Sequence, residues 1–202
     1  MWTASHDASQ HATLMDHNNF TDFPIPTGVR RQQLISLREK RESMPWSASF
    51  VGSIERTCLP RIVYLIALQG NDHISFDLSS HLADGLTPDQ SFAQYLNRLT
   101  STQVNVNFSL RSNGAAIRTG RIMETIGSAG LLVQEYCPLI RRWFSEDKHF
   151  IGFTNEIDLR ETLDKIVTDP KRYQEIRLAG TNFYEQNYSP IQMTKHLSSF
   201  RY

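Results

Sequence analysis

The chain has 202 residues, of which 21 are Lys or Arg and 21 are Asp or Glu, so it carries no formal net charge. This balance argues against a large nucleic-acid or anionic-membrane surface. No apolar run approaches the roughly 20 residues that span a bilayer. The sequence therefore predicts no nucleic-acid partner and no transmembrane segment, and its length suits one domain with a tail.

The first part of the chain is polar and differs in composition from the rest. Residues 1–22 are rich in Ser, Asn, Asp and Thr, and their three histidines have spacings that give no common helical face, so we expect a disordered tail and no metal site. Cys58 and Cys137 belong to no CxxC pair. This use of cysteine favours a reduced, cytoplasmic protein in which each thiol is a small buried side chain.

Residues 23–46 are interpreted as an extended segment followed by a linker helix. The first half contains two prolines, and proline disfavours helix at the residue before it. Residues 30–42 then show helical spacing, with Leu34 and Leu37 facing inward and the charged residues on the other faces.

From residue 47 onward, strand-like segments alternate with helix-like segments. Such alternation implies parallel strands joined by right-handed crossovers. We therefore predict a single α/β domain over residues 47–202, a Rossmann-like doubly wound parallel sheet of about five strands with a helical C-terminal tail. The predicted strands are 49–54, 73–78, 104–108, 131–133 and 150–153. The predicted helices are 57–69, 88–99, 120–128, 138–144, one from a cap at 154 or 155 through 166, 170–187, and one from 190.

Ligands of such folds bind at the carboxyl ends of the strands. Gly52 and Ser53 end the first strand, where a glycine lets backbone N–H groups approach a phosphate, although an ordinary tight turn is the alternative. Asn105 and Asn107 interrupt the third strand, which should be apolar on both faces. Asn107 lies near the carboxyl end, where its amide could reach a ligand or bond to a neighbouring loop.

Further polar residues follow the third and fourth strands. Arg111 and Arg118 bracket a loop that could close over a diphosphate or remain solvated. Glu135 follows the fourth strand, so we expect it at the crevice, where it could bond sugar hydroxyls or stay a surface carboxylate. No GxSxG motif is present and neither cysteine has a histidine beside it, so the sequence identifies no catalytic residue.

The most informative stretch runs from Thr119 to Glu135 and contains Arg121 and Glu124, which share a helical face. An arginine in a first helical turn opposes the helix dipole, which makes sense if the guanidinium and the helix N-terminus both contact an anion. A carboxylate one turn later can accept hydrogen bonds from a diol such as ribose. The pattern predicts a nucleotide site, with a plain Arg–Glu pair on a solvated helix as the alternative.

Two common nucleotide motifs are missing. The chain has no GxGxxG after a strand and no Walker loop. Their absence argues against an NAD enzyme and against a P-loop nucleotidase.

Several blocks of the sequence resemble the C-terminal half of family-1-type glycosyltransferases, in particular the spore-maturation-protein-like branch. The blocks are Phe50-Val-Gly-Ser53, Asn107-Phe-Ser109, and Gly120-Arg-Ile-Met-Glu-Thr125 with Gly130-Leu-Leu-Val133. The resemblance covers about residues 47–198. It implies a GT-B fold, in which two Rossmann-like domains face each other across a cleft and the C-terminal domain holds the nucleotide-sugar donor.

Carried over by position, the resemblance implies that Arg121 meets the donor diphosphate, that Glu124 holds the ribose hydroxyls and that Glu135 approaches the sugar. The substrate would be a UDP- or GDP-linked sugar. Neither a cofactor nor a metal is expected, because positive side chains and a helix terminus take the place of a metal. The predicted donor-binding set is Gly52, Ser53, Asn107, Arg111, Gly120, Arg121, Glu124 and Glu135.

The chain departs from this family at its N-terminal side, because about 46 residues before the first strand are too few for a second Rossmann-like domain. We therefore expect the acceptor domain to be absent, so that transfer requires a separate acceptor-domain protein or self-association. A non-catalytic interaction module derived from a glycosyltransferase and a different Rossmann-like nucleotide binder are the alternatives.

Overall fold

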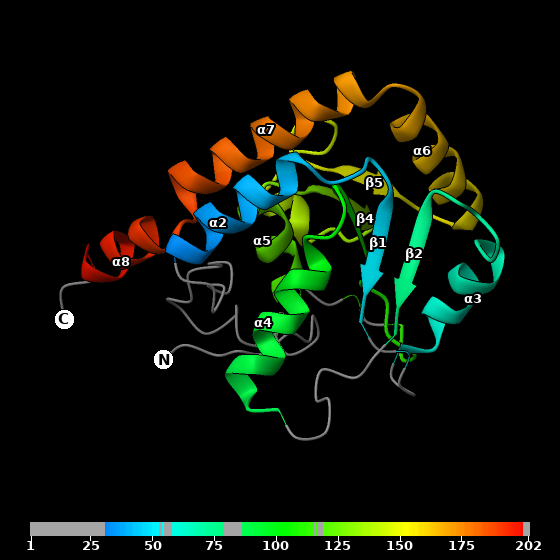
Figure 1. The fold of residues 1–202 in the computed structure, drawn as a ribbon, viewed down its shortest axis with the longest axis horizontal. Coiled ribbons are helices and arrows are strands. Elements are labelled where there is room, and N and C mark those ends of the chain that lie inside the picture. The colour runs from blue at the N-terminus through cyan, green and yellow to red at the C-terminus, as the bar shows by residue number, and fades with distance from the viewer. Residues whose placement is uncertain are drawn as a thin grey trace.

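The computed structural model describes residues 31–52, 54, 58–78, 86–114, 116 and 119–199. They form one five-stranded sheet in which every strand is parallel to its neighbours, in the order β2-β1-β3-β4-β5 (Figure 1). The strands are β1 (Ala48–Val51), β2 (Ile74–Asp77), β3 (Val104–Asn107), β4 (Leu131–Glu135) and β5 (Ile151–Phe153). The helices are α2 (Arg31–Glu42), α3 (Pro60–Ala67), α4 (Pro88–Leu99), α5 (Gly120–Gly127), the 3₁₀ helix η2 (Ile140–Arg142), α6 (Glu156–Thr168), α7 (Pro170–Asn187) and α8 (Pro190–Ser199).

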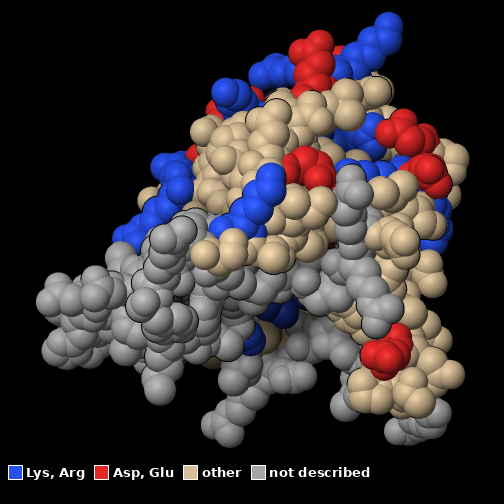
Figure 2. All heavy atoms as spheres, turned by 90° about the vertical axis from the view of Figure 1, so that its left-hand side faces the viewer, with Lys and Arg blue, Asp and Glu red and all other residues tan. Residues whose placement is uncertain are grey.

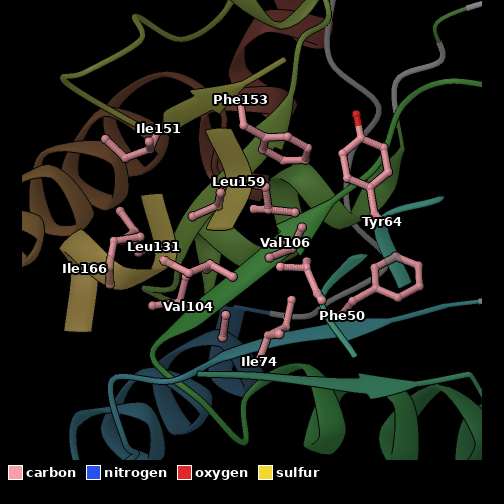
Figure 3. Packing of buried hydrophobic residues seen from close by; sticks show 14 of the residues in the cluster. Phe50, Tyr64, Ile74, Val104, Val106, Leu131, Ile151, Phe153, Leu159 and Ile166 are labelled. Atoms are coloured by element: carbon pink, nitrogen blue, oxygen red, sulfur yellow. The ribbon is translucent and has the colours of Figure 1, made fainter. Parts of the chain in front are cut away.

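Helices cover both faces of the sheet, which confirms the predicted doubly wound α/β fold. On one face, Val104 and Val106 of β3 pack with Leu159 and Ile166 of α6, and Figure 3 shows this cluster from close by. The other face packs against α4 and α5. Its buried residues include Val51, Leu96, Leu99, Ile122, Ile126 and Leu132. Successive side chains of a strand alternate between these two cores, as a sheet buried on both faces requires.

The helices α4, α6 and α7 begin where the sequence supplies capping side chains. The Thr87 hydroxyl accepts a hydrogen bond from the Gln90 N–H, and the Gln90 side chain accepts one from the Thr87 N–H, which forms a capping box at the start of α4. Asn155 caps α6, as predicted, and Asp169 caps α7 with Pro170 at the first helical position.

Several predicted segments differ from the structure. The strand expected over 49–54 covers Ala48–Val51, so Gly52 follows it. The helix expected over 138–144 is wrong in type, because only the single 3₁₀ turn η2 forms there, between Pro138 and a buried Trp143. The strand expected over 131–133 continues to Glu135, because β4 pairs with β5 through Glu135 and Phe153. Glu135 is therefore the last residue of a strand and does not belong to the loop that follows.

The expectation that every charged residue of α2 faces away from the core is wrong for Arg41. Leu34 is buried as predicted, but Arg41 is also buried, with 0% of its surface exposed. Its guanidinium donates to the Thr102 carbonyl at 2.9 Å, the Asn105 Oδ1 at 2.8 Å and the Leu99 carbonyl at 3.1 Å. Burial and the nearby charge of Arg177 lower the pKa of Arg41 to about 9, so it remains charged at neutral pH.

Other polar contacts tie α2 to α5 and α7, beside which it lies (Figure 1). The Arg38 Nε donates to the Gly127 carbonyl at 2.8 Å, and the Arg38 guanidinium pairs with Glu185 of α7. Arg177 of α7 pairs with Glu42 at 3.1 Å. Hydrogen bonds and ion pairs therefore connect α2 to the sheet and to the helices α5 and α7.

Charges of both signs share the described surface. Figure 2 shows Lys and Arg side chains interspersed with Asp and Glu over the described part of one face, so no large patch of a single sign forms there. Both cysteines are buried, as predicted, and no disulfide joins them. The expected tail over 1–22, Ser53 and Arg118 lie outside the described residues.

Candidate functional site

The helix α5 begins at the carboxyl edge of the sheet, next to the end of β3. Thr119 stands before its first turn in an extended conformation, with φ −111° and ψ 151°. The Thr119 hydroxyl does not cap the helix; it donates to the Asn107 Oδ1 at 3.1 Å. Among the described residues, the first N–H groups of α5 therefore have no side-chain cap.

Arg121 extends from α5 across the carboxyl ends of β3 and β1. It is 9% exposed. Its Nη1 donates to the Asn107 Oδ1 at 3.0 Å, and its guanidinium carbon lies 5.2 Å from the centre of the Phe50 ring. A Cβ on Gly52 would lie 2.8 Å from the Arg121 Nη2, so the absence of a side chain at Gly52 makes room for the guanidinium. Three predicted positions, Gly52, Asn107 and Arg121, thus converge on this part of the sheet edge.

The pocket beside Arg121 lies between α4 and α5 and has a volume of about 410 Å³. Arg121 and Glu124 both line it, as their shared helical face predicted. Its remaining lining residues are Pro88, Ser91, Phe92, Tyr95, Thr119 and Gly120. A pocket of this size falls in the range that holds a small ligand.

Glu124 has a hydrogen-bonding partner that the sequence did not suggest. Tyr95 of α4 donates its hydroxyl hydrogen to the Glu124 Oε2 at 2.5 Å. Burial raises the pKa of Glu124, while the hydrogen bond from Tyr95 and the charge of Arg121 lower it in part. Burial of Glu124 therefore favours the protonated form of its carboxyl group, whereas the hydrogen bond and the nearby charge favour the ionised form.

A hydrogen-bond network of buried amide side chains and one buried carboxylate lies next to the site. The Asn107 Nδ2 donates to the Gln134 Oε1 at 2.7 Å, and the Gln134 Nε2 donates to the Ser109 hydroxyl at 2.7 Å. Glu135 is buried, and its Oε2 accepts hydrogen bonds from the Ser109 and Leu110 N–H groups at 2.7 and 2.8 Å. In this structure Glu135 fixes the loop after β3.

Two more arginines lie near the same edge. Arg111 donates to the Cys58 sulfur at 2.5 Å. Arg61, in the first turn of α3, is 4% exposed, and its guanidinium carbon lies 5.6 Å from the centre of the Phe50 ring. Burial lowers the pKa of Arg61, and the charges of Arg121 and Arg111 lower it further, which places the three guanidinium groups within electrostatic reach of one another.

Sequence reasoning missed Arg61, Tyr95 and Gln134. Arg61 carries the only charge in the apolar helix α3, and Gln134 is a polar residue inside an apolar strand. A charge in an apolar helix could have indicated Arg61, and the argument that selected Asn107 could have selected Gln134 if the predicted strand had continued past Val133. Tyr95 gave no such signal, because its spacing on α4 matches that of a core residue.

Other classes of site find no support in the described part of the chain. Within that part, no group of three or more His, Cys, Asp or Glu side chains is arranged to hold a metal ion. None of its helices combines the length and the apolar character that crossing a membrane requires.

Several solved structures share this fold, and two of them are described with UDP. Alr3699/HepE of Anabaena, solved with UDP and glucose, has a TM-score of 0.59 at 10% identity, and the match covers 97% of this chain and 62% of HepE. A mutant of TarM from S. aureus, solved with Fondaparinux, alpha-GlcNAc-glycerol and UDP, has a TM-score of 0.55 at 10% identity. That match covers 96% of this chain and 43% of TarM. At such identities the likeness concerns the fold alone.

The sequence comparisons identify the family. A search of curated proteins gives no match. The profile of the glycosyl transferase-like family matches residues 82–198, which include α4, the pocket and the α5 residues Arg121 and Glu124. Because this match covers more than half of the chain, the protein belongs to the glycosyl transferase-like family.

Proposed function

We propose that this domain binds the donor of a glycosyltransferase, a nucleoside-diphosphate sugar, in the pocket between α4 and α5. The observation that carries the proposal is that Arg121 and Glu124, one turn apart, line the same pocket at the start of α5. A guanidinium next to a carboxylate matches a diphosphate next to a ribose, because one donates hydrogen bonds to an anion and the other accepts them from a diol.

The diphosphate would lie at the beginning of α5, beside Arg121. Arg121 presents its guanidinium at the pocket, and the first N–H groups of α5 have no side-chain cap among the described residues. Helix N-termini bind phosphate readily for this reason. Arg61 and Arg111 add positive charge near this edge.

The same groups suit the chemistry of sugar transfer. When the bond from the anomeric carbon to the diphosphate breaks, negative charge develops on the leaving group. Arg121 and the α5 N–H groups are hydrogen-bond donors that are already in place. They stabilise the charge of the departing diphosphate more than the charge of the intact nucleotide sugar. The domain would need neither a metal nor a cofactor for this step.

The donor base is proposed to be uracil or guanine. HepE and TarM have been solved with UDP and share the fold, which favours a UDP-linked sugar. This chain spans 62% and 43% of those two proteins. Transfer would require an acceptor-binding domain facing the carboxyl edge of the sheet.

A thermal-shift titration tests donor binding. At a UDP or GDP concentration near 100 times the dissociation constant, the folded state gains about 2.7 kcal/mol, which raises the melting temperature by roughly 5–10 °C for a domain of this size. The expected result is this shift with UDP or GDP, and little or none with NAD. Stabilisation by NAD or ATP alone would indicate a different nucleotide binder. No shift with any nucleotide would indicate an interaction module.

The affinity for UDP is expected to fall as the pH is lowered. The Glu124 carboxylate accepts from the ribose only while it is ionised, and burial raises its pKa, so this contribution is full above the raised pKa and lost below it. The loss should therefore begin at a higher pH than for an ordinary glutamate with a pKa of about 4.3. Calorimetric titrations at several pH values measure the effect.

The Glu124→Gln variant provides the control for this pH dependence, because its amide does not titrate. Protonation of the diphosphate itself affects both proteins equally. If the variant follows the same pH curve as the wild type, ionisation of Glu124 plays no part in binding.

A further inference from the structure

Tyr95 lines the same pocket as the two residues on which the proposed function depends. Its hydroxyl donates to the Glu124 Oε2 at 2.5 Å. Burial and the charge of Glu124 raise the pKa of Tyr95, so the phenol keeps its proton at neutral pH.

The ring that carries this hydroxyl is held firmly. Tyr95 is 8% exposed and belongs to the core that α4 and α5 form with the sheet. The Phe92 ring stacks on it, with 5.9 Å between ring centres and 23° between ring planes. An aromatic side chain has only two rotatable bonds, so such packing leaves the hydroxyl little freedom.

The two oxygens of Glu124 consequently differ. Oε2 is engaged by Tyr95. Oε1 has no hydrogen-bond partner among the described residues, and it lies 3.2 Å from the position that a Cβ on Gly120 would occupy. This second oxygen is therefore directed at the first residue of α5, where Gly120 also lines the pocket.

We propose that Tyr95 is a positioning residue for ribose recognition: by holding Oε2, it directs the Glu124 Oε1 at the ribose hydroxyls. This inference rests on the proposed function, because it assumes that the pocket takes a nucleoside diphosphate. Without the hydroxyl, Glu124 loses a charge-assisted hydrogen bond and is free to turn towards Arg121.

The test compares UDP with its 2′,3′-dideoxy analogue, which keeps the base and the diphosphate but lacks both ribose hydroxyls. Calorimetry gives the two dissociation constants for the wild type and for Tyr95→Phe. We expect the wild type to prefer UDP by about tenfold or more, as hydrogen bonds to a charged group allow. In Tyr95→Phe this preference should fall to roughly threefold or less, with the affinity for the dideoxy analogue nearly unchanged.

Tyr188→Phe is the matched control. Tyr188 also uses its hydroxyl in a partly buried hydrogen bond, to the Trp143 carbonyl at 3.3 Å, but it does not line the pocket. This variant should keep the wild-type preference for UDP. A general loss of stability from a missing hydroxyl would affect both variants and would not change the ratio of the two constants.

The outcomes separate this inference from the proposed function. If the wild type binds neither nucleotide, the proposed function fails and this inference fails with it. If the wild type prefers UDP and folded Tyr95→Phe retains that preference, the inference alone is overturned. If Tyr95→Phe does not fold in buffer, it is measured in an osmolyte that favours the folded state, and a retained preference for UDP there also overturns the inference.

Discussion

Replacing Arg121 with alanine is expected to weaken the binding of UDP or GDP at least tenfold. The guanidinium donates to Asn107, lies over Phe50 and faces the pocket from the start of α5, so it is held in place before a ligand arrives. Removing one preorganised donor from an oxyanion-type site costs roughly 2.7–4 kcal/mol, which exceeds the 1.4 kcal/mol of a tenfold change. Isothermal calorimetry on the purified domain measures the loss.

Arg98→Ala is a suitable control for this substitution. Arg98 is also an arginine of the sheet-covering layer, but it pairs with Asp77 at 3.2 Å and does not line the pocket. Its removal should leave the affinity unchanged. Arg121→Lys should fall between the wild type and alanine, because lysine keeps the charge and loses the planar fork. Unchanged affinity in a folded Arg121→Ala protein would remove Arg121 from the donor site.

Replacing Arg41 with alanine is expected to destabilise the domain by about 3–5 kcal/mol, from the cavity left in the core and from buried acceptors that lose their donor. The Thr102 carbonyl and the Asn105 Oδ1 lose their hydrogen bonds from Nη1, and both of these residues are buried. Urea or thermal unfolding followed by circular dichroism gives the change in the free energy of unfolding.

Lys40→Ala separates this effect from a change in helix propensity. Lys40 precedes Arg41 on α2, is exposed and contacts the Asn97 side chain at 3.2 Å. Substitution of such a surface residue normally changes stability by less than about 0.5 kcal/mol. A similar small effect for Arg41→Ala would mean that the buried guanidinium gains from its hydrogen bonds no more than its burial costs.

The fold could be predicted from the sequence because its signals are local. Proline and capping residues mark the starts of α4, α6 and α7, and short β-rich runs between them mark the strands. Segments without such signals were less well predicted. The single turn η2 has too few residues for a helical period, and the end of β4 is polar, so neither boundary follows from composition.

The candidate site could be predicted only in part. Arg121 and Glu124 lie on one helix, so their common face follows from a spacing of three residues. Tyr95 and Arg41 belong to other helices, and only the tertiary packing brings Tyr95 to Glu124 and Arg41 to Asn105. Both residues also fit a simpler interpretation, Tyr95 as a core aromatic and Arg41 as a charge on a solvated helix face. No pattern in the sequence shows that these simpler interpretations are wrong.

The two asparagines of β3 permit only one alignment of that strand. Asn105 is bonded to Arg41, Ser49 and the Leu99 carbonyl, while Asn107 is bonded to Arg121, Thr119 and Gln134. If the register of β3 shifted by one residue, both amide side chains would face the apolar core under α6. Val104 and Val106 would then face the arginines. A misaligned β3 would therefore lose the hydrogen bonds of Asn105 in its middle and those of Asn107 at its carboxyl end.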